Sequence, residues 1–323
     1  MIGTLKDGTQ AMATAIVLER KEGTTKTGNA YLDLTVGDKS GSLECKLWGY
    51  TPELHGELKE GSVVNVHLTV STYNGRLQGK IGTISPSSED PRRLVKGTRF
   101  DPDAMADEVM AYVNLFTEPL TKKVAEELLA ADWESFKQIP AAVGNHNNWP
   151  GGLLEHVWSM CRIASFVADH YKKLYKVPFS KDKVMFGIIC HDLGKIVEYE
   201  TDGVTCKYAP EGILVPHIVS AIGWVYSRAN AWYQKNPDVM TKAEFVCERN
   251  QLVHIVAAHH GKEEWGSPVK PATLEAILVH QIDMIDSKFM HALGLIEGRP
   301  GNLLGFSEPS RTEKTSYMLY SVE

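Results

Sequence analysis

The sequence has little that would place its 323 residues in a membrane or in an oxidising compartment. No run approaches the roughly 20 apolar residues of a membrane-spanning helix, and the N-terminus lacks a charged and then apolar signal segment. The five cysteines are scattered and form no Cys-x-x-Cys pair, which is typical of reduced thiols rather than of a disulfide framework. We therefore expect a cytoplasmic protein without a membrane partner.

The sequence also has no excess of positive charge. Its net charge is −6, which argues against a broad electrostatic attraction to nucleic acid. Residues 1–85 have a net charge of zero, so the negative charge lies in the remainder of the chain. Acidic side chains there can face metal cations, and the charge therefore does not exclude a nucleic-acid substrate.

Residues 1–85 show the alternation of apolar and polar residues that is typical of β-strands. We predict strands over 13–18, 30–36, 42–48, 63–70 and 76–81, with a polar turn over 21–29 and a short helix over 53–59. Five strands with a helix before the fourth are the elements of a small OB-fold barrel, an all-β fold whose exposed face binds single strands. We assign residues 1–85 to such a domain.

Aromatic and basic residues on these strands are candidates for contacts with a single-stranded nucleic acid. Aromatic rings stack on bases, and Lys and Arg contact phosphates. The candidates are Tyr31, Trp48, Tyr73, Arg76 and Lys80. Tyr31 and Trp48 have an alternative interpretation as core residues, which for Trp48 carries at least equal weight because it ends a strand beside Gly49.

The remainder of the chain has a helical pattern. Residues 86–102 contain Pro, Ser and charged residues without periodicity, which indicates a linker. Residues 103–323 form a second, all-α domain in which we predict helices over 104–116, 121–131, 133–143, 151–175, 217–234, 241–260 and 272–293, and a hairpin over 198–208. A further buried helix is expected from the apolar run 184–189.

The most informative stretch is Cys190–Lys195, at the end of this apolar run. An imidazole and a carboxylate beside a core are unfavourable unless something satisfies them, and a divalent metal ion does so. If the helix continues to Lys195, its ammonium group lies one turn from His191 and Asp192 on the same side. Metal ligands beside a positive charge are typical of a site that handles phosphate.

Four other ligand-type residues lie within or at the end of apolar helical segments: His156, His217, His259 and Asp283. A hydrogen-bonded core histidine would explain any one of them. Together with His191 and Asp192, however, they favour a metal site, because six such groups along several helices are hard to explain separately.

The order of these six residues resembles that of HD-domain metal-dependent phosphohydrolases with a two-metal site. Further stretches are similar to the YhaM-type 3′-to-5′ exoribonucleases, a family that also has an N-terminal OB domain. They are 140–142 with His146, 151–156, 191–195, 211–214, 258–261, 264–268 and 282–286. The resemblance covers nearly the whole chain and implies a multidomain protein, a small all-β OB-fold barrel followed by an all-α HD-domain helical bundle.

The resemblance also implies a ligand set for two divalent metal ions. One ion would be held by His156, His191, Asp192 and Asp283, and Asp192 would bridge to a second ion held by His217 and His259. Such a pair polarises a phosphodiester and generates hydroxide near neutral pH. Manganese is the expected metal, with Fe, Mg, Co and Zn as alternatives.

Three more residues receive roles from the resemblance. Lys195 would neutralise the charge that develops on the scissile phosphate. His146 and His260 would support the ligands or contact the phosphate.

The expected function is a metal-dependent 3′-to-5′ exonuclease that degrades single-stranded RNA, and DNA as a second polymer; a homo-oligomer is left open. One alternative is an HD-type hydrolase of free nucleotides or cyclic dinucleotides, because a fold alone does not select a substrate. The OB pattern favours polymers instead. Another alternative is a single-strand-binding protein without catalysis. The neutral OB domain argues against it, since contacts of Lys and Arg with phosphates supply most of such affinity.

Overall fold

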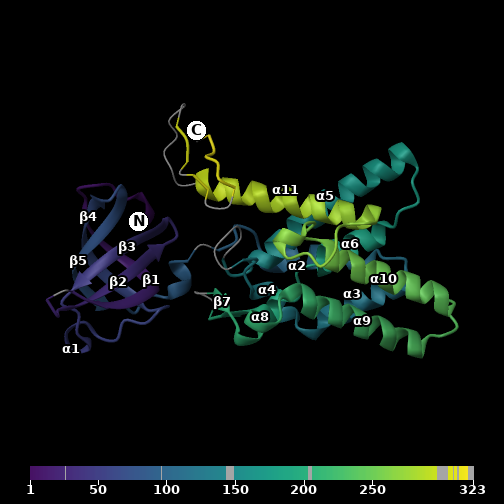
Figure 1. Ribbon diagram of the computed structural model, residues 1–323, viewed down its shortest axis with the longest axis horizontal. Helices are drawn as coiled ribbons and strands as arrows, with labels where there is room; N and C mark the ends of the chain where they lie inside the picture. The colour runs from purple at the N-terminus through teal and green to yellow at the C-terminus, as the bar shows by residue number, and fades with distance from the viewer. Residues whose placement is uncertain are drawn as a thin grey trace. The chain divides into compact units, whose positions relative to one another are not determined.

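The computed structural model describes residues 1–25, 27–95, 97–142, 149–202, 206–296, 305–307, 309–310 and 313–318. These residues divide into two compact units, one built on residues 1–97 and the other on residues 98–200 and 206–294. Figure 1 labels the helices and strands of both. None of the helices within the described ranges is both long and apolar enough to cross a membrane.

The first unit is a closed five-stranded barrel. Its strands are β1 (Gln10–Thr24), β2 (Ala30–Asp38), β3 (Gly41–Trp48), β4 (Val63–Tyr73) and β5 (Arg76–Pro86), with the short helix α1 (Pro52–His55) between β3 and β4. The order around the barrel is β1-β2-β3-β5-β4. Neighbours are antiparallel except β3 and β5, whose parallel pairing closes the barrel. This confirms the predicted OB-like fold.

Strand β1 is longer than predicted because it pairs with two neighbours. Its first half, from Gln10 to Ile16, lies along β4, and its second half continues along β2 as far as Thr24. A shift of register between Val17 and Glu19 bends the strand from one partner to the other. The predicted turn over 21–29 is therefore wrong in its first half, where residues 21–24 are paired with β2.

The second unit is a helical bundle. Its helices are α2 (Pro102–Asn114), α3 (Pro119–Ala131), α4 (Trp133–Gln138), α5 (Gly152–Tyr175), α6 (Lys181–Cys190), α7 (Lys195–Glu198), α8 (Pro210–Leu214), α9 (His217–Lys235), α10 (Lys242–Ala258) and α11 (Leu274–Ile296). A small hairpin of β6 (Tyr199–Thr201) and β7 (Cys206–Tyr208) follows α7. Helices α9 and α10 pack side by side (Figure 1). The predicted all-α class of this unit is confirmed.

Helix α6 lies at the centre of the bundle and positions the His191-Asp192 pair. Every residue from Lys183 to Cys190 is buried, and the helix packs against α2, α3, α5 and α10. Gly187 allows this close packing, because a Cβ atom there would lie 2.4 Å from Ile255 and 2.7 Å from Val279. A helix that is apolar all round belongs in a core.

The helix does not continue to Lys195. It ends at Cys190, a turn covers residues 191–194, and the short helix α7 then begins at Lys195. The turn brings Gly194 against the first residue of α9, since a Cβ atom on Gly194 would lie only 2.1 Å from the carbonyl oxygen of His217. The break in the helix thus lets a distant histidine approach Asp192.

Candidate metal centre

Five segments bring the six predicted ligand residues together. His156 lies on α5, His191 and Asp192 follow α6, His217 begins α9, His259 follows α10, and Asp283 lies on α11. Asp192 is central: its Oδ2 lies 3.3 Å from His191 Nε2, and its Oδ1 lies 3.3 Å from His217 Nε2 and 3.6 Å from His259 Nε2. His156 Nε2 lies 3.3 Å from Asp283 Oδ1.

The four histidines point the same nitrogen toward the centre. Each Nδ1–H donates outward: His156 to Asp286 at 2.7 Å, His191 to the Ile188 carbonyl at 2.9 Å, His217 to Glu198 at 2.8 Å, and His259 to the Val256 carbonyl at 2.7 Å. A hydrogen bond from one ring nitrogen fixes the tautomer and leaves the other nitrogen as a metal ligand. The four Nε2 atoms are therefore the ring nitrogens that could bind a metal ion.

Buried atoms at the centre have no hydrogen-bond partner. Within the described residues, six buried side-chain nitrogen or oxygen atoms are unpartnered, and four of them are Nε2 of His191, His217 and His259 and Oδ1 of Asp192. Leaving a buried polar atom unpaired costs about 1–3 kcal/mol, so four in one place require an explanation. A divalent cation accepts both imidazole and carboxylate ligands, and these residues fit one.

The pKa shifts keep the ligands in forms that bind cations. Burial would raise the pKa of Asp192, but Lys195 and His191 outweigh it and hold the pKa well below its usual range. Burial, with the neighbouring His259, lowers the pKa of His260 to about 4, and burial also lowers that of His259. Near neutral pH, Asp192 is thus ionised and these two histidines are neutral, as coordination requires.

His156 has a different environment from the other ligands. Burial lowers its pKa, but hydrogen bonds to Asp283 and Asp286 outweigh this effect and raise the pKa to about 10. The positive charge on the ring balances the two carboxylates. A metal ion that binds at this position must therefore replace a proton.

Comparison with known proteins places this centre in a family. Residues 153–288 match the family described as HD domain. The 3′-5′ exoribonuclease YhaM of Halalkalibacterium halodurans is 33% identical over 265 residues, which cover 81% of this chain and 78% of that protein. YhaM of Shouchella clausii is 35% identical over 262 residues, 80% of this chain and 77% of that protein. The chain belongs to the YhaM exoribonuclease family.

Membership of the YhaM family confirms the resemblance seen in the motifs. YhaM of Listeria innocua is 34% identical over 280 residues, which cover 82% of this chain and 81% of that protein. Among solved structures, the second OB-fold domain of replication protein A from Methanococcus maripaludis is 22% identical, with 28% of this chain and 95% of that chain covered and a TM-score of 0.24.

Lys195 lies beside Asp192 as expected, although the helix is interrupted between them. Its Nζ donates to Asp192 Oδ2 at 2.6 Å and to the Ala141 carbonyl oxygen at 2.7 Å, and the residue is buried. The ammonium group therefore holds the carboxylate in place and ties it to the segment before residue 143. His146, which was predicted to support the ligands or contact the phosphate, lies outside the described residues.

Two carboxylates in this YhaM-type centre were not predicted as site residues. Glu198 accepts both the backbone N–H of His217 at 3.1 Å and its Nδ1–H at 2.8 Å, and these bonds lower its pKa although burial opposes them. Asp286 accepts from His156 and from the Ser159 hydroxyl. Asp286 could have been found from the sequence, because it lies one helical turn after Asp283. Glu198 could not, because its partner His217 is 19 residues away and no local pattern marks it.

His260 lies beside the candidate ligands His217 and His259. Unlike His191 and His259 it is partly exposed, and one of its nitrogens lies within 4.8 Å of ligand atoms of His217 and His259. Its Nδ1–H donates to the backbone carbonyl of Trp265 at 2.7 Å. The Nε2 atom of His260 is therefore the acceptor nitrogen of a partly exposed ring beside the centre.

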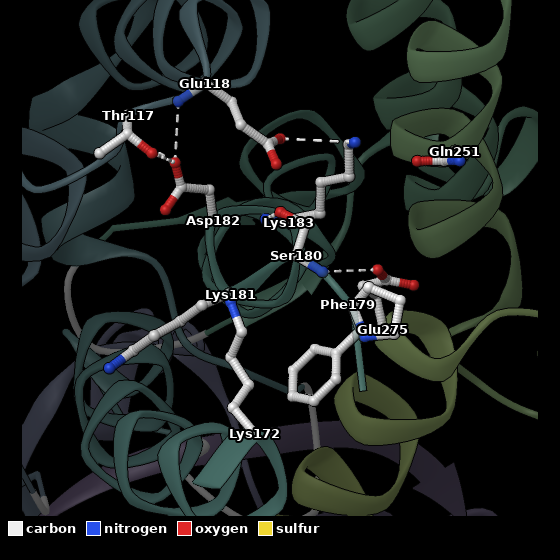
Figure 2. A pocket seen from close by; sticks show the side chains of 11 residues that line it. Thr117, Glu118, Lys172, Phe179, Ser180, Lys181, Asp182, Lys183, Gln251 and Glu275 are labelled. Carbon is white, nitrogen blue, oxygen red and sulfur yellow. Dashed lines mark hydrogen bonds and ion pairs between the residues drawn. The ribbon is translucent and has the colours of Figure 1, made fainter. Parts of the chain in front are cut away.

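A second polar pocket, of about 370 Å³, lies at the opposite end of α6 (Figure 2). Its charged groups are paired with protein groups: Asp182 accepts from the backbone N–H groups of Thr117 and Glu118, and Lys183 lies 3.5 Å from the Glu118 carboxylate (Figure 2). Glu275 accepts from the backbone of Ser180 at 2.8 Å. These contacts stabilise helix ends, and the lining resembles a structural site rather than a second metal centre.

The predicted nucleic-acid residues lie on the outer surface of the barrel. Trp48 is 47% exposed and Tyr31, its cross-strand partner, is partly exposed, so the alternative interpretation of both as core residues is wrong. Their ring centres are 5.2 Å apart. Lys46, which was not predicted, lies 4.5 Å from the Tyr31 ring centre and opposite Lys80 on the neighbouring strand. Tyr73 and Arg76 face each other at the tip of the β4–β5 hairpin.

Proposed function

We propose that this chain is a metal-dependent 3′-to-5′ exonuclease that hydrolyses single-stranded RNA, with DNA as a second polymer. The observation that carries the proposal is the convergence of unpartnered buried atoms of His191, His217, His259 and Asp192. Its YhaM relatives are named 3′-5′ exoribonucleases, which supplies the direction and the substrate. A single-strand-binding protein without catalysis would not need such a cluster.

The proposed ligand sets follow the clusters. His156, His191, Asp192 and Asp283 hold one divalent ion, and His217 and His259 hold a second, with Asp192 shared between them. The opposite orientations of the two Asp192 oxygens support this division, since Oδ2 faces His191 and Oδ1 faces the other pair. We propose manganese as the metal; Fe, Mg, Co and Zn have compatible chemistry.

Bound divalent ions would polarise the phosphodiester and supply hydroxide near neutral pH. The protein's own part is to hold the ligands rigid: Glu198 and Asp286 orient two imidazole rings, and Lys195 fixes Asp192. Lys195 has one N–H group beyond the two hydrogen bonds it makes, and this group can contact a phosphate oxygen. We assign a second phosphate contact to Nε2 of His260, beside the centre.

We further propose a division of labour between the domains. Residues 1–85 hold the strand, residues 86–102 link the domains, and residues 103–323 carry out the hydrolysis. Trp48 and Tyr31 would stack on bases, while Lys46, Arg76 and Lys80 would contact phosphates. The adjacent positions of Lys46 and Lys80 on β3 and β5 support such a contact surface.

End-labelled strands test the proposal. A single-stranded RNA of about 20 nucleotides, labelled at either end, is incubated with the protein and Mn²⁺, with or without chelator. We expect the 5′-labelled strand to shorten progressively and the 3′-labelled strand to release labelled mononucleotide at once, both only without chelator. Release of mononucleotide from the 5′ label first, or no cleavage with Mn²⁺, Mg²⁺, Fe²⁺ or Co²⁺, would contradict it.

A further inference from the structure

An exposed tryptophan lies in the loop that follows His259 and His260 of the candidate metal centre. Of the seven tryptophans, all of which the structure describes, only Trp48 and Trp265 are exposed, at 47% and 44%. Trp48 belongs to the barrel, whereas Trp265 ends a 3₁₀ helix (Glu263–Trp265) in the loop that follows His259 and His260. A large exposed aromatic side chain beside a catalytic centre is typical of a binding site.

The backbone of Trp265 is part of the rim of the centre. Its carbonyl oxygen accepts the Nδ1–H of His260 at 2.7 Å. Its indole ring centre lies 6.4 Å from that of His280, and His280 in turn donates to the carbonyl of the ligand His259 at 2.7 Å. Trp265 is therefore tied through its backbone to His260, a partly exposed histidine beside the centre.

The loop that carries Trp265 is held rigidly. The backbone N–H groups of Trp265 and Ser267 both donate to the Lys262 carbonyl, at 3.1 Å each. Ser267 is buried, and its hydroxyl lies within hydrogen-bond distance of the carbonyl oxygens of Ala257 and Val269. A loop whose backbone is held in advance loses little freedom when a ligand binds to it.

A positive charge accompanies the ring. The ammonium group of Lys262 lies 4.4 Å from the centre of the indole, the arrangement of a cation–π pair. An aromatic surface for a base beside a cation for a phosphate is the combination that proteins use to bind single-stranded nucleic acid.

We propose that Trp265 is a stacking platform for the base of the nucleotide next to the scissile phosphate, that is, the 3′-terminal nucleotide that is removed. The inference rests on the proposed exonuclease function. Trp265 binds the nucleotide whatever its base, because every base presents a flat face to the indole, and Lys262 contacts the sugar–phosphate beside it. This subsite selects for a base and against an abasic or otherwise unstacked end.

Two substrates that differ by one base test the subsite. One is a 5′-labelled oligoadenylate with an adenosine at its 3′ end, and the other carries an abasic ribose there. For the wild-type protein we expect KM to be about tenfold lower for the intact end, equivalent to roughly 1.4 kcal/mol. Trp265→Ala should raise KM for the intact end to that of the abasic end and leave the abasic end unchanged. Trp265→Phe should keep most of the preference.

Trp48→Ala is the matched control, with the same substitution at a nearly equally exposed tryptophan. It should leave the ratio of the two KM values unchanged, because the substrates are identical except at the 3′ end. A Trp265→Ala protein that keeps the preference, or that loses affinity for both ends alike, would overturn the subsite while the exonuclease function stands. A wild-type protein that cleaves neither substrate would contradict both.

Discussion

At the scale of single residues, Asp192 has the largest number of contacts in the centre. It faces His191, His217 and His259, and its Oδ2 accepts a hydrogen bond from Lys195. Among these five residues, Asp192 alone carries a negative charge. The pairing with Lys195 also means that the lysine's first role is to hold Asp192.

Asp192→Asn should abolish metal binding and slow turnover by about 10²-fold or more. The amide keeps the shape of the side chain but loses the charge and one of the two acceptor oxygens.

Lys195→Ala should lower both the bound metal and the rate, because Asp192 Oδ2 loses its partner. Metal analysis and rate measurements check both variants, with the exposed Asp238→Asn as control. A metal-replete, fully active Asp192→Asn protein would contradict the role.

Glu198→Gln should weaken the binding of one metal ion about 10–100-fold. Glu198 accepts two hydrogen bonds from His217, and a glutamine offers only one acceptor and adds a donor that opposes Nδ1–H. Titration with Mn²⁺ measures the affinity of each ion. Glu200→Gln is the control, because this exposed residue pairs with Lys207 at 3.2 Å and not with His217. Equal affinities in both variants would refute the orienting role.

At the scale of elements, the packing of α6 decides where the His191-Asp192 pair lies. Gly187 has no room for a side chain, whereas Gly223 in the middle of α9 has nothing within 4 Å of the position that a Cβ atom would occupy. The same substitution should therefore have opposite effects in the two helices. The sign of the effect reports packing rather than helix propensity.

Gly187→Ala should destabilise the protein by about 1–3 kcal/mol through overpacking, while Gly223→Ala should stabilise it by roughly 0.5–1 kcal/mol. The melting temperature of each variant measures this. A fall of several degrees for the first and a small rise for the second are expected. Two falls of similar size would show that α6 is not packed as closely as described.

The elements themselves were largely predictable from the sequence, and their ends were not. Period-two alternation located all five barrel strands, and apolar periodicity located the long helices, because burial of one face determines both patterns. The end of α6 depends on Gly194 lying against His217, and the length of β1 depends on two different partners. Both are contacts between residues far apart in the chain, which a local pattern cannot contain.

The same distinction applies to the metal centre. The six candidate ligands, which the structure brings together, could be singled out from the sequence because each breaks an apolar segment. Glu198 was not, because its partner His217 is 19 residues away. Lys46 was missed as well, since its position beside Tyr31 follows from strand register. Glu198 and Lys46 do not interrupt an apolar segment, so they can be identified only from their contacts in the folded chain.

At the scale of the whole molecule, removal of metal should affect one of two unfolding transitions. The barrel and the bundle have separate hydrophobic cores, so we expect two transitions in calorimetry. Ions present at 100 times their dissociation constant stabilise the bundle by about 2.7 kcal/mol, and chelator should lower its transition by about 5–10 °C. The barrel transition should not move. If chelator shifts neither unfolding transition, or shifts that of the barrel alone, the proposed location of the metal is contradicted.

The centre joins the middle of the chain to its last long helix. His156 on α5 depends for both ring nitrogens on Asp283 and Asp286 of α11, and His156 and Asp286 are 130 residues apart. At about 5–20 residues per second, a ribosome needs roughly 6 to 26 seconds between these two codons. Until nearly the end of that interval the nascent chain lacks Asp283, the last of the residues proposed to hold the first ion. A chain built in this way cannot complete the proposed metal centre until α11 has been synthesised.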